Sequence, residues 1–271
     1  MLRSMGVSVS VLASGSRGNS TVVESSQARI LVDAGLSGRE TFKRLKSIGL
    51  DPRSLSAILI SHEHTDHVNG LATLAKKLNV PVFMTGATHQ AWARSLRDAA
   101  GELPKVEKLE IFSAGRPFQI ADVTVTSFTI PHDAADPVGF TFRAEGAKIA
   151  IATDLGYIPV SVCDQLRRCD VLVIESNHDL EMLRVGPYPW SVKQRVMSRV
   201  GHLSNESLAQ FFAADYDRGA SYIVLAHLSE HNNHPEVARK AAEDALGPQR
   251  TLIENRILLA AQDAPTESIR L

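Results

Sequence analysis

One short run, HEHTDH at residues 62–67, carries most of the chemical information in this sequence. Imidazole nitrogens and carboxylate oxygens are the ligands that zinc and similar divalent metals take in proteins. On an extended or looped backbone, His62, His64 and Asp66 point to the same side, whereas His67 points in another direction. One loop could therefore serve two adjacent metals, the first through His62 and His64 and the second through Asp66 and His67. Such a density of ligand-type side chains argues against a helix-capping role alone.

Three single polar residues later in the chain could complete such a site. His132, Asp154 and His227 each come directly after a run of apolar, strand-like sequence. Taken one at a time, a residue of this kind is more often a satisfied polar group at a strand end. Their shared context makes all three candidates for the ligands that the run at 62–67 cannot supply.

Length, composition and charge narrow the class of protein. The chain has 271 residues, of which 44% are hydrophobic, and a formal net charge of −1. No linker or low-complexity stretch divides it, so we expect a single domain over residues 1–271. A nearly neutral chain does not hold long nucleic acid through its overall field, so any contact with a polyanion must be local.

The cysteines and the N-terminus indicate a cytoplasmic protein. Two cysteines, Cys163 and Cys169, can form neither a disulfide framework nor a four-cysteine zinc site, which predicts free thiols. Residues 1–6 lack the pattern of a signal peptide, and no apolar run is long enough to cross a bilayer. We therefore expect no membrane partner. The oligomeric state is left open.

Strand-like and helix-like segments alternate in two roughly equivalent halves, which predicts sheets covered by helices. The expected strands are residues 7–12, 21–24, 29–33, 55–60, 82–84, 123–130, 139–144, 148–152, 171–175 and 222–226. The expected helices are residues 38–48, 71–78, 87–97, 160–166, 204–215 and 235–245. Ligand-type residues follow several strand ends, where proteins of this kind usually place their sites.

In order along the chain, Asp33, the run at 62–67, His132, Asp154 and His227 resemble the five motifs of the metallo-β-lactamase fold. The resemblance extends from about residue 7 to residue 245. It implies an α+β protein, a four-layer αβ/βα sandwich, with two divalent metal ions, zinc or manganese, at one edge of the sheets.

The resemblance also implies a role for each ligand-type residue. One metal would be held by His62, His64 and His132. The other would be held by Asp66, His67 and His227, with Asp154 bridging the two. Asp33 would lie behind the ligands and orient them.

Other residues narrow the chemistry. Ser16 and Asn19 belong to a loop of small residues at 14–20 whose backbone N–H groups could bind an anion, and both are predicted to contact substrate. Glu175 and His202 could pair as a carboxylate-oriented imidazole that donates a proton to a leaving oxygen. They could also be only a buried acid and a helix-start residue. His178 is expected behind the site or in contact with substrate.

With the strings ESNHD at 175–179 and GHLSN at 201–205, these features resemble the phosphodiesterase side of the superfamily, and most of all the WalJ/YycJ-type bacterial metallohydrolases. That family is associated with nuclease activity, with 5′ exonuclease action on DNA as a candidate. The transfer-RNA processing enzymes of the superfamily carry a long arm rich in glycine and proline. The sequence has no such insertion, so DNA is the better expectation than transfer RNA.

The implied mechanism is hydrolysis by a water that two metals bridge and make acidic. Asp66, His202 and Glu175 are the predicted catalytic residues. A metal-dependent thioester or amide hydrolase, glyoxalase-like or lactamase-like, is an alternative, because the fold does not fix the substrate. A non-catalytic or redox metal-binding protein is a further alternative.

Basic and aromatic residues between the Glu175 and His202 motifs bear on the polyanion question. The basic ones are Arg184, Lys193, Arg195 and Arg199. They could form a local phosphate-binding face, although such charges are more often a solvated surface. Tyr188 and Trp190 could stack on a base, or belong to a rigid loop packed on the core.

Overall fold

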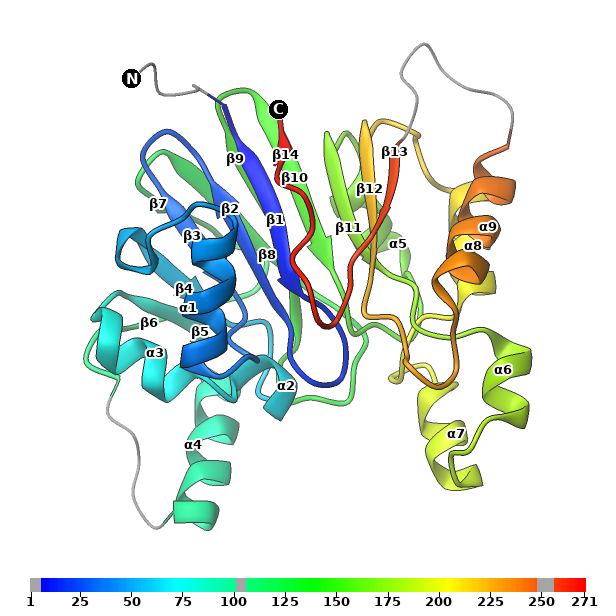
Figure 1. Ribbon diagram of the computed structural model, residues 1–271, viewed down its shortest axis with the longest axis horizontal. Helices are drawn as coiled ribbons and strands as arrows, with labels where there is room; N and C mark the ends of the chain where they lie inside the picture. The colour runs from blue at the N-terminus through cyan, green and yellow to red at the C-terminus, as the bar shows by residue number, and fades with distance from the viewer. Residues whose placement is uncertain (1–5, 101–105, 248–255) are drawn as a thin grey trace.

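The computed structural model describes residues 6–100, 106–247 and 256–271, and its strands form two seven-stranded sheets (Figure 1). The first sheet holds β1 (Ser8–Ala13), β2 (Ser20–Glu24), β3 (Arg29–Val32), β4 (Ala57–Leu59), β5 (Val82–Thr85), β6 (Leu109–Phe112) and β14 (Ile269–Arg270). The second holds β7 (Pro117–Ile120), β8 (Val123–Thr129), β9 (Val138–Ala144), β10 (Ala147–Ala152), β11 (Val171–Glu175), β12 (Tyr222–Ala226) and β13 (Arg256–Leu259).

The two sheets repeat one pairing pattern. In the first, β14, β1, β2 and β3 are paired antiparallel, and β3 to β6 are paired parallel. In the second, β7 to β10 are antiparallel and β10 to β13 are parallel. Parallel neighbours need crossover connections, and helices supply them. This repeat accounts for the two equivalent halves expected from the sequence.

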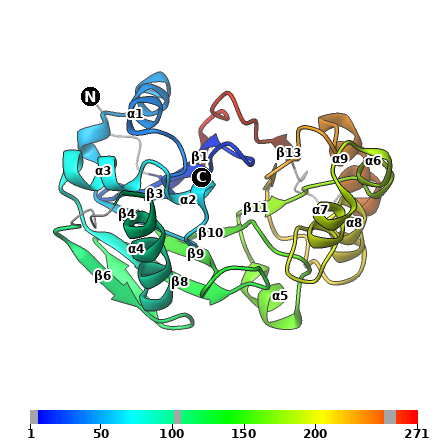
Figure 2. The same cartoon turned by 90° about the horizontal axis from the view of Figure 1, so that it is seen from below.

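Helices cover the outer face of each sheet (Figures 1 and 2). The helices are α1 (Gly38–Ser47), η1 (Pro52–Ser54), α2 (Thr65–Val68), α3 (Leu71–Leu78), α4 (Gly86–Ala100), α5 (Val160–Leu166), α6 (Leu180–Val185), α7 (Trp190–Val196), α8 (Asn205–Ala214) and α9 (Pro235–Leu246). Buried side chains of α1, α3 and α4 pack on the first sheet, and those of α5, α8 and α9 on the second.

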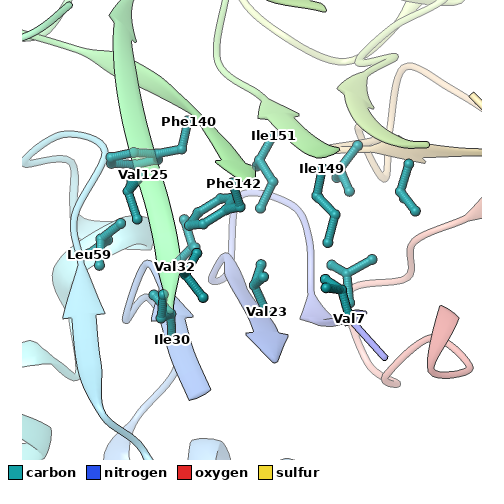
Figure 3. Packing of buried hydrophobic residues seen from close by; sticks show 14 of the residues in the cluster. Val7, Val23, Ile30, Val32, Leu59, Val125, Phe140, Phe142, Ile149 and Ile151 are labelled. Atoms are coloured by element: carbon teal, nitrogen blue, oxygen red, sulfur yellow. The ribbon is translucent and has the colours of Figure 1, made fainter. Parts of the chain in front are cut away.

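The main hydrophobic core lies between the two sheets. Figure 3 shows side chains from both sheets, among them Val32, Phe142 and Ile151, pointing into this space. Residues alternate across a strand, so Val138, Phe140 and Phe142 of β9 all face inward. Burying one phenylalanine contributes roughly 1.5–3 kcal/mol. Two helical layers around two sheets confirm the expected α+β sandwich.

Most expected elements are present within one to three residues of their predicted ends. The cap expected at Ser204 is present, because its Oγ accepts a hydrogen bond from Ser207 N at 3.1 Å. Glu145 and Gly146 connect β9 to β10, both with positive φ, as a tight hairpin turn requires. The expected strand at 55–60 is shorter, because only Ala57–Leu59 pair as a ladder.

Several elements were not predicted. The edge strands β6 and β7 are largely exposed, so their sequences lack the apolar pattern of a buried strand. The short helices α6 and α7, and the strands β13 and β14, also went unrecognised. Residues 1–5, part of the segment searched for a targeting signal, lie outside the described residues. Within the described ranges, no helix is both long and apolar enough to span a membrane.

The topology brings the predicted site residues to one edge. Parallel strands end on the same side of a sheet, so the segments after β3 and β4 leave one edge of the first sheet, and those after β10, β11 and β12 leave one edge of the second. Asp66 and His67 lie close to Asp154 and His227, so these two edges adjoin. The short helix α2, which contains Asp66 and His67, lies on this side (Figures 1 and 2).

Candidate metal centre

Three of the predicted site residues have an unusual backbone conformation. Asp33, Asp154 and His227 follow β3, β10 and β12, and their φ angles are 61°, 61° and 55°. Residues other than glycine rarely adopt this left-handed conformation, which costs on the order of 1–3 kcal/mol and occurs often at functional sites. All three side chains are buried. The backbone is thus strained in the same way, with a positive φ, at three strand ends that border the candidate site.

The first group of ligand-type side chains is His62, His64 and His132, whose nitrogens lie within 4.8 Å of one another. His62 Nδ1 lies 3.0 Å from Ser61 Oγ, and His132 Nδ1 donates to the Gly201 carbonyl at 3.1 Å. Because their Nδ1 atoms are hydrogen-bonded to the protein, His62 and His132 keep Nε2 for another partner. His64 Nδ1 faces His132 Nε2 at 3.3 Å.

The second group is Asp66, His67, Asp154 and His227, again with ligand atoms within 4.8 Å of one another. His67 Nε2 is 3.2 Å from Asp154 Oδ2, and His227 Nε2 is 3.6 Å from Asp66 Oδ2. Burial raises the pKa of Asp66, but the charge of His67 and the close approach of the His227 and His67 imidazoles outweigh it and lower this pKa well below its ordinary value. The Asp66 carboxylate is therefore ionised and available as a ligand.

Asp33 fixes the orientation of the second group from behind. Its Oδ2 accepts a hydrogen bond from His67 Nδ1 at 2.8 Å and another from Ser61 Oγ at 2.9 Å. Its Oδ1 accepts from Ser61 N at 2.8 Å. A carboxylate that holds the outer nitrogen of an imidazole sets its tautomer and directs the inner nitrogen to a metal. These contacts are compatible with the orienting role predicted for Asp33, which stays a prediction.

Glu175 holds two histidines at once. Its Oε1 accepts hydrogen bonds from His202 Nδ1 and His227 Nδ1, both at 2.8 Å. Its Oε2 accepts from Leu155 N at 2.8 Å and from Leu203 N at 3.3 Å. Burial raises the pKa of Glu175, but the two histidines outweigh it and lower this pKa to about 2. Both carboxylate oxygens are thus occupied, so Glu175 orients other side chains and is poorly placed to bind a metal itself.

His202 borders the second group and remains accessible. Its side chain is 20% exposed, and its ring centre lies 5.1 Å from that of His227 and 5.3 Å from that of His132. With Nδ1 hydrogen-bonded to Glu175, Nε2 is the nitrogen that remains for a reacting group. The sequence predicted this pair, but not that Glu175 also holds His227.

The chemistry of both groups fits divalent cations. His62 Nε2, Asp154 Oδ2 and His227 Nε2 are buried, and none forms a hydrogen bond with any described residue. Burial holds the pKa of His62 well below its ordinary value, so this imidazole is neutral and has a free lone pair. Unpaired polar atoms in the interior are costly unless something binds them. Divalent metals are bound by this combination of imidazole and carboxylate.

The loop at 14–20 is placed differently from the simple expectation of an open anion-binding turn. Asn19 is buried, and its Nδ2 donates to Asp66 Oδ2 at 3.0 Å. Ser16 is exposed and Ser14 is buried, with Ser14 Oγ accepting from His227 N at 2.7 Å. The contacts of Asn19 favour a role in orienting Asp66, whereas substrate binding by Ser16 and Asn19 stays a prediction.

Sequence reasoning missed the supporting roles of Ser14 and Ser61. A signal was present for Ser61, which directly precedes the run at 62–67. His178 is buried next to Asn177, and its carbonyl accepts from Asn205 N at 2.8 Å. Burial lowers the pKa of His178 to about 4, so it is neutral and belongs to neither ligand group. Its predicted position behind the site remains compatible with these contacts.

The fold, the two ligand groups and the sequence together identify the protein family of this chain. Residues 28–228 match the family model described as the beta-lactamase superfamily domain, and the chain belongs to this family. The YhfI protein of Bacillus subtilis, a metallo-β-lactamase fold protein, superposes with a TM-score of 0.71 at 18% identity, covering 96% of this chain and 99% of that one. A diphosphatase of the PhnP family gives 0.65 at 16% identity, with 98% of each chain covered.

Two further relatives are more similar in sequence to this chain than these two structures are. The exodeoxyribonuclease YycJ of Bacillus anthracis is 41% identical over 242 residues, which cover 89% of this chain and 90% of that protein. The exodeoxyribonuclease WalJ of Streptococcus pneumoniae is 38% identical over 234 residues, 86% of each chain. These similarities confirm the resemblance inferred from the motifs.

Proposed function

We propose that this chain is a metal-dependent phosphodiesterase that hydrolyses nucleic acid, and more specifically a DNA exonuclease that uses two divalent ions, zinc or manganese. The observation that carries the proposal is the pair Glu175–His202 beside the two ligand groups. A nucleotide leaves a phosphodiester as an alkoxide, which is a poor leaving group unless it is protonated. A thiolate leaves readily without an acid, because its conjugate thiol has a pKa near 8.5.

The ligand groups define what each residue would do. His62, His64 and His132 would hold one ion, and the second group would hold the other, with Asp154 between them. When bound, such ions activate a water and neutralise charge on the phosphate oxygens. His202 would hold the transferable proton on Nε2, facing the leaving oxygen. Glu175 would stabilise the protonated imidazole, since its carboxylate is buried and ionised.

The names of the similar proteins support the nucleic-acid substrate. YycJ and WalJ are both described as exodeoxyribonucleases. We therefore propose DNA as the substrate. The 5′ polarity is part of the proposal only through the resemblance of the motifs. Buried free thiols at Cys163 and Cys169 support a cytoplasmic location. A core shared by both sheets supports one domain over residues 1–271.

A leaving-group comparison tests the proposal. His202→Ala should keep its metal and lose about 10²–10⁴ in kcat on DNA, but much less on bis(4-nitrophenyl) phosphate, whose phenolate leaves without help. The matched control is His89→Ala, because His89 lies on α4 and belongs to neither ligand group. Equal losses on both substrates would contradict the proton-donor role. Hydrolysis of a thioester without any hydrolysis of phosphodiesters by the wild-type protein would overturn the proposed function.

A further inference from the structure

The segment that follows α7 is packed tightly against the loops that carry His132 and Asp154. The Val200 carbonyl accepts a hydrogen bond from Asp133 N at 3.1 Å, and the Gly201 carbonyl accepts from His132 Nδ1. On the other loop, a Cβ added at Gly156 would lie 2.4 Å from the backbone of Arg199. The segment therefore has a fixed position beside the ligand groups. Figure 1 shows α7 beyond the end of the second sheet, on the side where α2 lies.

Arg195, near the end of α7, is tied to this same corner. Its Nε donates to Asp133 Oδ2 at 2.6 Å, and Asp133 Oδ1 lies 3.5 Å from His132 Nε2. The guanidinium is thus one carboxylate away from the first ligand group. The hydrogen bond to Asp133 raises the pKa of Arg195 against the opposing effect of burial, and the charges of Asp133 and Asp66 raise it further, so this guanidinium stays charged.

Arg199 presents a second cation on the segment after α7. Its guanidinium stacks over the ring of Tyr157, 4.1 Å from the ring centre, and Tyr157 lies three residues after Asp154. Within the described parts of the chain, the terminal nitrogens of Arg195 and Arg199 donate no hydrogen bond. Both side chains are therefore held in place through one part of the guanidinium and have donors left over.

We infer that Arg195 and Arg199 form a binding face for phosphates of a polynucleotide that lie next to the hydrolysed one. This inference rests on the proposed function. Guanidinium donors in a fixed plane match the oxygens of a phosphate, and holding Nε leaves the two terminal nitrogens for a bidentate contact. A neutral thioester or lactam offers no anion to these cations. A small phosphodiester would use only the metal site, so a face beyond that site indicates a substrate with several phosphates.

A simpler role for Arg195 is structural. In that role, the ion pair between Arg195 and Asp133 would only attach α7 to the loop after β8. An exposed ion pair contributes about 0.2–1 kcal/mol to the free energy of unfolding. That role predicts equal effects of an Arg195 variant on all substrates. A phosphate contact predicts an effect that depends on the length and charge of the substrate.

The test compares Arg195→Gln with Arg167→Gln in the metal-loaded protein. Arg167 is an exposed arginine directly after α5 whose ion-pair partner, Asp164, lies on that helix, so it controls for loss of one positive charge. We expect Arg195→Gln to raise KM for a single-stranded oligonucleotide about tenfold. The Kd for a phosphorothioate oligonucleotide, measured by fluorescence anisotropy, should rise by the same factor. The slope of log Kd against log salt should fall by about 0.7. Arg195→Gln should hydrolyse bis(4-nitrophenyl) phosphate at nearly the wild-type rate, and Arg167→Gln should behave like wild type with both substrates.

A neutral linkage sharpens the test. Replacing the phosphate next to the scissile one by a methylphosphonate should weaken binding to the wild-type protein, but should add little to the defect of Arg195→Gln. Parallel losses on the oligonucleotide and the aryl ester, or full additivity of variant and linkage, would overturn the phosphate contact. A wild-type protein that binds the oligonucleotide through Arg195 but hydrolyses no phosphodiester would refute the proposed function alone.

Discussion

Gly35 lies against the backbone of the run at 62–67, which makes it a sensitive probe of the metal centre. A Cβ added at Gly35 would lie 1.6 Å from the Asp66 carbonyl oxygen and 2.6 Å from Asn19 N. Real Cβ contacts are essentially never shorter than 3.0 Å, so Gly35→Ala must move the Asp66 backbone by about 1.5 Å. The movement also breaks the hydrogen bond from Asn19 N to Asp66 O, which is 2.7 Å long.

Two consequences follow from this displacement. Forcing an extra methyl into a packed interior costs about 1–3 kcal/mol, so the Tm should fall by several degrees. Asp66 and His67 move with the backbone, and the geometry of the second ligand group is lost. A shift of about 1 Å can cost 10²-fold in rate, and disturbed support of a ligand costs about 10–100-fold in metal affinity.

The assay for Gly35→Ala is metal content by mass spectrometry after dialysis against a competing chelator, together with turnover of DNA. Gly86→Ala is the matched control, because its added Cβ would meet nothing closer than 3.8 Å, at the start of α4. The control should bind metal and turn over like wild type. If Gly35→Ala kept wild-type metal content and rate, the packing of Gly35 against Asp66 would not position the ligands as described.

Two further predictions concern Glu175 and Cys169. Glu175→Gln should lower metal affinity about 10–100-fold and also lower the rate on DNA, because both His202 and His227 lose their carboxylate partner; an isothermal metal titration that shows unchanged affinity would contradict this orienting role. Burial raises the pKa of the Cys169 thiol from 9.0 to about 11, so the folded state keeps its proton after the unfolded chain has lost it. The contribution of Cys169 to stability is therefore constant below pH 9 and declines as the pH rises from 9 to 11, by at most about 3 kcal/mol. Urea unfolding at pH 8 and pH 10 should show a smaller loss for Cys169→Ala than for wild type, and an equal loss would refute the assignment.

The sequence predicted those parts of the site that are concentrated in short motifs or that follow strong strands. The run at 62–67 could be recognised as a candidate metal site because its ligand-type residues are adjacent in sequence. Asp154 and His227 could be recognised as candidate ligands because long apolar runs precede them, and such runs are the clearest sign of a buried strand. The edge strands β6 and β7 lacked this sign, because water covers much of both.

The double role of Glu175 could not be predicted, because the hydrogen bond to His227 joins residues 52 positions apart through two neighbouring parallel strands. The same holds for Ser14, whose hydroxyl reaches His227 across 213 positions. Helix α6 was recognisable in part: Asp179 caps it by accepting from Met182 N at 2.8 Å, a common start signal. Helix α7 begins after Pro189 but buries little apolar surface, so no periodic pattern marked it.

Release of nucleotides from end-labelled DNA by metal-stripped and reloaded protein tests the central claim most directly. We expect the stripped protein to be inactive and its activity to return as zinc or manganese is added, with the rate still rising as a second ion per chain binds. His64→Ala and Asp66→Ala should fail to recover under the same conditions. Full DNA turnover by the stripped protein, or reloaded protein that leaves DNA intact, would contradict a metal-dependent nuclease.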